Sequence, residues 1–202
     1  MKRLILSCLL LVSSGLMSRS AQGQIGPRRD LVLPGMSVDG VELGGSPSSF
    51  QAVFSQHPGQ VGAQIGRSGA AQCPDGVYYW SDLARDTSVA TAYLKGGAIS
   101  QLSVQGPVFS LPNGLKTGAT EEQVRQASPK AQMYVLLHSG NKVNGGRDLH
   151  YWVDEEAGVA FKLAWWQSKK LRSVSGIDIF PKGSAYRPEG CISTPQQWEK
   201  LK

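Results

Sequence analysis

The sequence predicts an α+β protein of two tandem modules, each a short capped helix packed on a small antiparallel sheet. Residues 40–50 and 114–124 run in parallel, with glycines at matching positions, at a constant offset of 74 residues. Residues 79–82 and 151–154 both read Tyr-Trp-x-Asp, at an offset of 72 residues. Internal similarity at a fixed spacing is typical of a chain that contains one supersecondary unit twice.

The repeat also sets the expected boundaries along the chain. We expect a signal peptide at 1–23, a lead-in segment at 24–33, module 1 at 34–106, module 2 at 107–183, and a C-terminal tail with a short helix at 184–202. Each module is too small to bury a sufficient core by itself. The two modules should therefore share a packed interface.

Each module is expected to begin with a helix. Ser46 is followed by Pro47, which places a capping hydroxyl before a proline at the first helical position. At the matching place in the second module, Thr120 lies three residues before Gln123, the spacing of a capping box.

Short β-branched and aromatic segments follow each helix and predict strands. The Lys-Gly-Gly sequence at 95–97 predicts a tight hairpin. Gly-, Ser- and Asn-rich loops at 59–75 and 138–148 are expected to set partner specificity. The predicted strands are residues 77–80, 90–94 and 99–104 in module 1, and residues 149–153, 159–165 and 174–180 in module 2.

Alternation with a period of two assigns side chains to the two faces of each sheet. If Tyr151 and Val153 join the helix-side core with Phe161, then His150 and Trp152 point outward. The offset of 72 sends their counterparts in module 1 outward as well. The resulting open aromatic face is a candidate binding surface, although burial of the same residues between the modules is an alternative. Its residues are Tyr78, Trp80, His150, Trp152, Lys162 and Trp166.

The N-terminus predicts the compartment. Lys2 and Arg3 precede an apolar run at 4–12, and small residues follow, as in a secretory signal peptide cleaved after Gly23 or Ser20. A membrane anchor is the alternative, but the run is about half of the roughly 20 residues that a spanning helix needs. We expect a secreted or periplasmic protein with no stable membrane anchor after cleavage.

Charge argues against a nucleic-acid partner. The formal net charge of the whole chain is +6. Cleavage would remove three basic residues and leave about +3. A charge this mild and scattered does not form the basic stripe that nucleic-acid binding requires.

Cleavage would leave two cysteines, Cys73 and Cys191. In an exported chain a disulfide between them is the expected pairing, and it would join the first module to the tail. Two free thiols are the alternative, and with them a small hydrolase that uses Cys73 and a histidine.

Catalytic signatures are lacking in the sequence. It contains no Gly-x-Ser-x-Gly elbow, no zinc-protease motif, no phosphate-binding glycine loop and no paired-cysteine metal spacing. We therefore expect no catalytic residues, no metal and no cofactor.

The segment Leu115-Lys-Thr-Gly-Ala-Thr-Glu-Glu-Gln-Val124, with the order of helix and strands, resembles the beta-lactamase inhibitory protein family. It is also similar to the single-module SmpA/OmlA lipoproteins of outer-membrane assembly. The resemblance implies a scaffold that binds other proteins across its sheet faces and connecting loops. This chain departs from the inhibitor pattern, which has a disulfide within each module, because its one expected bridge spans the modules.

These observations predict an exported, non-enzymatic scaffold that binds another protein or an envelope component, with inhibitor-like action among the implied roles. The cysteine hydrolase and a purely structural envelope factor are the alternatives.

Overall fold

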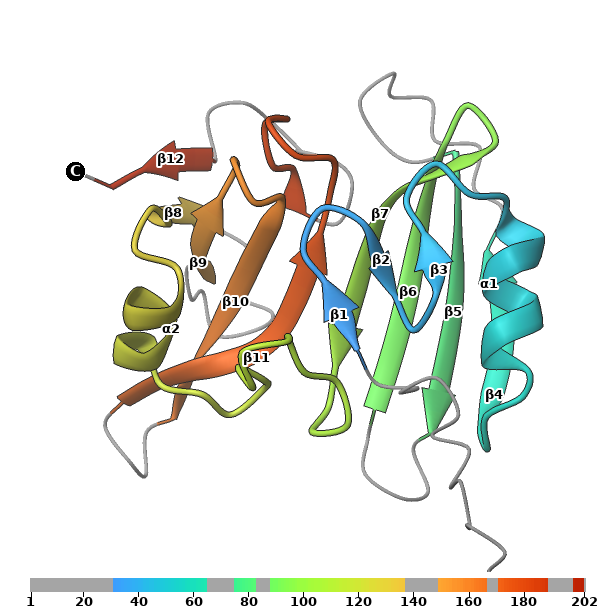
Figure 1. Cartoon of the computed structure of the whole chain (residues 1–202), viewed down its shortest axis with the longest axis horizontal. Coiled ribbons are helices and arrows are strands. Elements are labelled where there is room, and N and C mark those ends of the chain that lie inside the picture. The colour runs from blue at the N-terminus through green and yellow to red at the C-terminus, as the bar shows by residue number, and fades with distance from the viewer. Residues whose placement is uncertain are drawn as a thin grey trace, which may run out of the picture.

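The computed structural model shows a mainly β protein with two short helices in its described part (Figure 1). Nine antiparallel strands form one large sheet, in the order β12-β8-β9-β10-β11-β7-β6-β5-β4, and β1-β2-β3 form a small second sheet. The described residues are 31–64, 75–82, 88–136, 149–166, 171–188 and 198–201.

The elements fall into an N-terminal small sheet and two halves of similar order. The small sheet comprises β1 (Val32–Leu33), β2 (Ser37–Val38) and β3 (Val41–Glu42). The first half comprises α1 (Pro47–Phe54), β4 (Gln60–Gln64), β5 (Gly76–Asp82), β6 (Ser88–Lys95) and β7 (Ala98–Gln105). The second half comprises α2 (Glu121–Ala127), β8 (Gln132–Leu136), β9 (Leu149–Asp154), β10 (Val159–Trp166) and β11 (Leu171–Ile179), and β12 (Trp198–Lys200) follows it.

The last strand of each half joins the two halves. In each half a helix precedes four strands, and each of these strands pairs with the next. The halves meet where β11 pairs with β7, with Ile177 opposite Val104 and Ile179 opposite Leu102. The expected α+β composition with antiparallel strands is therefore present, but one continuous sheet replaces the two small sheets that we expected.

Both helices begin after a glycine in the left-handed region, Gly44 at φ +80° and Gly118 at φ +86°. The capping box of α2 is confirmed: the Gln123 amide donates to Thr120 Oγ1 at 3.2 Å, and the Thr120 amide donates to Gln123 Oε1 at 2.8 Å. The expected cap of α1 is wrong in part. Ser46 takes the N-cap position before Pro47, but its hydroxyl makes no capping hydrogen bond.

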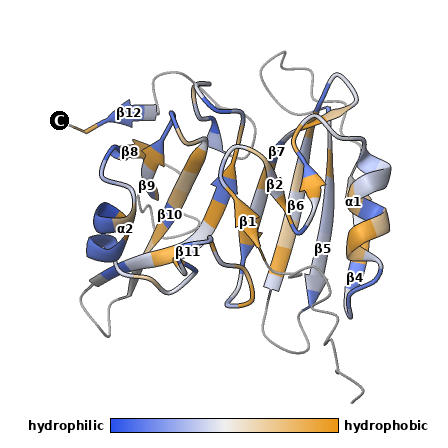
Figure 2. Cartoon of the chain, in the orientation of Figure 1, coloured by the Kyte–Doolittle hydropathy of each residue, from blue (hydrophilic) through white to orange (hydrophobic). Residues whose placement is uncertain are grey.

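Neither helix of the described part is long and apolar enough to span a membrane. Their amphipathic character also differs. Phe50 and Phe54 of α1 are buried, whereas Val124 is the buried residue of α2. Figure 2 shows the same contrast, with hydrophobic residues on α1 and the middle strands and a largely hydrophilic α2.

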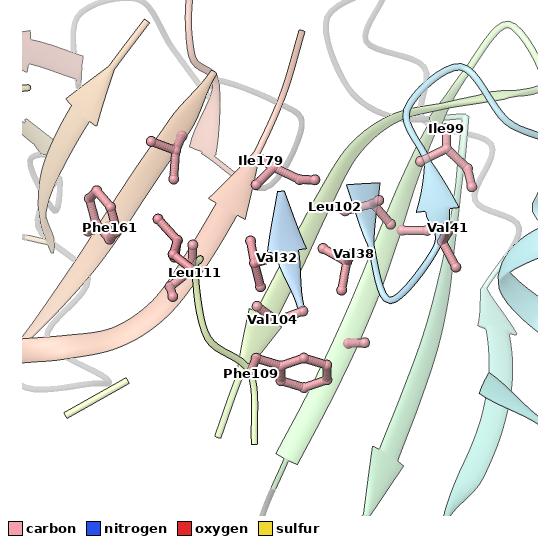
Figure 3. Packing of buried hydrophobic residues seen from close by; sticks show 14 of the residues in the cluster. Val32, Val38, Val41, Ile99, Leu102, Val104, Phe109, Leu111, Phe161 and Ile179 are labelled. Carbon is pink, nitrogen blue, oxygen red and sulfur yellow. The ribbon is translucent and has the colours of Figure 1, made fainter. Parts of the chain in front are cut away.

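The main core lies on the face of the large sheet that the helices and the small sheet cover (Figure 3). Val32 and Val38 of the small sheet are 0% and 1% exposed, and they pack with Leu102 of β7. Residues from both halves belong to this one cluster, including Phe54 and Phe161. The two halves are thus fused through a common core as well as a common sheet.

A second cluster lies on the opposite face. Tyr151, Val153 and Ala160 pack there with Phe180 and Tyr186. The expectation that Tyr151 and Val153 join the helix-side core is wrong. Val153 pairs with Ala160 rather than with Phe161, and paired residues share a face, so the side chains of β9 have the opposite phase.

Several strands lie where the sequence predicted none. β4 falls inside the expected loop at 59–75, and β8 lies in a segment to which we assigned no element. In the tail, Trp198–Lys200 is a strand that pairs with β8, so the expected closing helix is wrong for these residues. Short edge strands such as β4, Gln-Val-Gly-Ala-Gln, acquire their structure from a neighbour rather than from strong local propensity.

The two helix caps predict different responses to the same truncation. Thr120→Ala should lower the free energy of unfolding by about 1 kcal/mol, because it removes a capping hydrogen bond. Ser46→Ala, which removes a hydroxyl that makes no cap, should change it by no more than a few tenths of that amount. Urea denaturation of both variants measures the difference, and equal losses would contradict the two cap geometries.

Candidate functional site

The six residues expected to form one open aromatic face do not share a face. Tyr78, Trp80 and Trp152 pack against the helix-side core. His150 pairs with Leu163 of that core, so it lies on the same face, whereas Lys162 pairs with Tyr151 and lies on the other. The side chain of Trp166 is outside the described residues.

Trp80 belongs to the core, so its expected outward orientation is wrong. It is 5% exposed. Its ring centroid lies 5.4 Å from that of Phe54, 5.7 Å from that of His57 and 6.3 Å from that of Phe109. A side chain at Gly59 would come within 2.7 Å of the buried Trp80 Nε1, so glycine is required there. The apolar face of α1 provides the cover that alternation along β5 cannot reveal.

His57 forms the main polar contact of this region. Its Nε2 lies 2.7 Å from Asp39 Oδ2, and the two side chains are 18% and 6% exposed. Asp39 lies in the turn between β2 and β3, and His57 follows α1. The pair therefore ties the small sheet to the end of α1 and serves the fold.

Trp152 has a different setting beside α2. It is half-buried, and its Nε1 donates to Glu121 Oε1 at 3.3 Å. The guanidinium carbon of Arg125 lies 5.9 Å from the centre of its ring. Glu121 also lies 4.0 Å from Arg172 of β11, which holds the carboxylate near the indole. Trp152 is thus fixed in orientation while part of its ring stays accessible.

A pocket of about 430 Å³ opens beside Trp152. We call it the Trp152 pocket. Its inner wall includes Ser128 and Ala131, which are 9% and 8% exposed. At its rim, Arg125 and Glu122 form an exposed ion pair at 3.6 Å. The lining residues are Glu122, Arg125, Gln126, Ser128, Pro129, Ala131 and Trp152.

A second pocket, of about 610 Å³, lies against the other side of α2. It is lined by the turn at 113–119 and by Gln123, Gln126 and Ala127, and it contains no aromatic side chain. The Trp152 pocket is the better candidate site, because tryptophan and arginine together are typical of strongly contributing binding residues.

The chemistry of the Trp152 pocket is that of binding. Its one hydroxyl, on Ser128, has no histidine or cysteine beside it in the pocket wall. Within the described ranges, no three His, Cys, Asp or Glu side chains converge as a metal site. The residues of the alternative thiol mechanism, Cys73 and Cys191, lie outside the described residues, as do the signal segment at 1–23 and the loop at 138–148.

The opposite face of the sheet contains a buried tyrosine and carboxylate. The Tyr186 hydroxyl donates to Asp178 Oδ2 beneath the segment that follows β11. Burial, and then the negative charge of Asp178, raises the pKa of Tyr186 well above its ordinary value. This contact anchors the segment at 181–188 to the sheet.

The part of that face formed by β5, β6 and β7 is more open. Tyr79 is 37% exposed, and Thr91 and Ser103 are half-buried. Antiparallel sheets commonly keep one solvated face, so these residues need no ligand to explain them.

The Tyr186 contact predicts a pH dependence of stability. Because the pKa is raised in the folded state, its contribution is complete below the unfolded value near 10 and is lost as the pH rises toward the folded pKa. Tyr186→Phe should cost roughly 1–3 kcal/mol at pH 7 and should make the decline in alkaline solution shallower than in the wild type. Urea unfolding at pH 7 to 11 measures both effects, and parallel pH profiles would contradict the assignment.

The two repeated tryptophans should differ in accessibility. Trp152→Phe should reduce the fraction of tryptophan fluorescence that acrylamide quenches, because it removes a half-buried indole. Trp80→Phe should leave the quenchable component in place, since Trp80 is 5% exposed. The same loss of quenchable fluorescence in both variants would contradict this placement.

Comparison with known proteins gives little similarity. No protein-family model matches the sequence, and no curated protein matches it significantly. Among solved structures, the uncharacterized protein yfeY from Escherichia coli is similar at 13% sequence identity, over 75% of this chain and 99% of that chain, with a TM-score of 0.42. A similarity at this level supports no inference about function.

Proposed function

We propose that the protein is an exported, non-enzymatic binding protein that holds another protein or an envelope component at the Trp152 pocket. The observation that carries the proposal is a half-buried tryptophan fixed beside an arginine at the mouth of a pocket. Tryptophan and arginine are enriched among the few residues that contribute most of the energy of protein interfaces.

The rigidity of the site supports this function. Trp152 lies on β9, an inner strand with β8 on one side and β10 on the other. Its indole nitrogen is held by Glu121, and Glu121 lies near Arg172. A side chain that is already ordered loses little conformational freedom when a partner binds.

The division of labour between the halves also supports it. We propose that the chain consists of two tandem modules derived from one unit, which explains both the offset of 74 residues and the recurrence of a helix before four strands. In this proposal the first module mainly stabilises the protein, and the second module carries the binding site.

Export decides where the partner is found. The basic and apolar N-terminus motivates a secreted or periplasmic location, so the partner belongs to that compartment. The resemblance to the beta-lactamase inhibitory protein family makes an inhibited enzyme one form of such a partner.

Capture from an extract of the exported compartment, followed by mass spectrometry, tests the proposal. A protein captured by the wild type should be lost, roughly 30-fold, with Arg125→Glu, because reversal of a central interface charge costs about 2 kcal/mol or more. Arg187→Glu is the matched control, since this exposed arginine follows Tyr186 on the segment anchored to the other face. Melting temperatures verify that both variants are folded.

Equal capture by Arg125→Glu and the wild type would contradict a partner at this site. Capture that is lost with Arg187→Glu and retained with Arg125→Glu would place the partner on the opposite face instead.

A further inference from the structure

The two halves of the protein differ at the positions beside their aligned tryptophans. Trp80 and Trp152 each lie on the second strand after the helix of their half, and both belong to the helix-side face. Their helices begin from Ser46 and Thr120, which are 74 residues apart. Because the starting points match, residues separated by 74 along the helices occupy equivalent helical positions.

In the first half, aromatic residues fill the space beside the tryptophan. Phe54, the last residue of α1, lies 5.4 Å from Trp80 between ring centroids, and His57 lies 5.7 Å from it. Phe54 and His57 are also in contact, with centroids 5.6 Å apart. Trp80 is therefore enclosed by rings supplied by its own chain.

In the second half, the equivalent positions carry small residues. An offset of 74 places Ser128 at the position of Phe54 and Ala131 at the position of His57. Ser128 and Ala131 line the Trp152 pocket, whose volume is about 430 Å³. The space that two rings fill in the first half is therefore a pocket in the second.

We infer that the Trp152 pocket binds an aromatic side chain of the partner protein, which packs on Trp152 as Phe54 and His57 pack on Trp80. The inference rests on the proposed function and specifies what the partner must supply. Aromatic pairs are favourable at centroid separations of 4.5–7 Å, the range found around Trp80. The volume of the pocket lies within the usual span for pre-formed ligand sites.

The charges around the pocket favour a neutral ring over an ion. Arg125 lies over Trp152 and pairs with Glu122, so the rim holds one positive and one negative side chain. Nearby, Lys130 and Glu156 form a further balanced pair at 2.5 Å. The indole N–H is already bonded to Glu121, which leaves the ring itself and the small residues as the available surface. A partner cation would meet Arg125, and an anion would meet Glu122.

Fluorine NMR of the purified protein labelled with 5-fluorotryptophan tests the inference without a known partner. The probes are N-acetyl-phenylalaninamide and, as an aliphatic control, N-acetyl-leucinamide; Trp152→Phe and Trp80→Phe assign the two signals. We expect the phenylalanine amide to shift the Trp152 signal in a saturable manner and to leave the Trp80 signal unchanged. Equal shifts with both amides, or no shift of Trp152, would overturn the inference.

Filling the pocket provides the matched variant. Ser128→Phe with Ala131→His reproduces the arrangement of the first half and should abolish the shift at Trp152. Ala131→Leu alone, a smaller change, should reduce it and serves if the double variant does not fold. An undiminished response in a folded, filled variant would show that the amide binds elsewhere and would refute the inference.

The same variants separate this inference from the proposed function. If Arg125→Glu loses the captured partner but the filled variant retains it, the protein binds at this surface without an aromatic anchor, and the inference fails alone. If no partner is captured but the phenylalanine amide still shifts Trp152 selectively, the pocket is specific for aromatic rings and the proposed protein partner fails.

Discussion

The pairing of β7 with β11 is the contact on which the remainder of the structure depends. Leu102 and Val104 lie opposite Ile179 and Ile177, and all four are at most 1% exposed. This pairing turns two four-stranded sheets into one, and it protects an edge of each that would otherwise have unpaired backbone groups. The small sheet and both helices can then pack on a single face, so that the core of one half is completed by the other (Figures 1 and 3).

Within this shared framework, equivalent positions have acquired different roles. Trp80 is enclosed by Phe54 and His57 and contributes to stability, whereas Trp152 has a pocket where its counterparts would lie. The helices differ in the same sense, since α1 buries two phenylalanines and α2 buries one valine. A weaker apolar contact beneath α2 is the physical counterpart of its accessible surface. Stability and binding are thus divided between the two halves of one sheet.

Much of the local structure could be predicted because it depends on neighbouring residues. The capping box of Thr120 and Gln123 uses groups three positions apart, and the turn at Gly96 and Gly97 uses two positive φ angles that glycine adopts freely. The strands β5, β6, β7, β9, β10 and β11 were predicted within a few residues of their bounds. By contrast, β4 and β12 are edge strands with short or weakly β-forming sequences, and pairing with β5 and β8 defines them. The candidate site was predicted only through Trp152, since its pocket depends on small residues that have no sequence signature.

The sequence by itself determined the repeat, the order of helix and strands in each half, and the helix starts, because these follow from local propensity and hydrogen bonding. The tertiary structure decided which face each side chain occupies. Alternation along β9 separates Tyr151 from Trp152 but does not say which of them faces α2, because both faces of the sheet are covered at this end. Strand register settled that question by pairing Trp152 with Phe161, and the packing of α2 then left a pocket beside it.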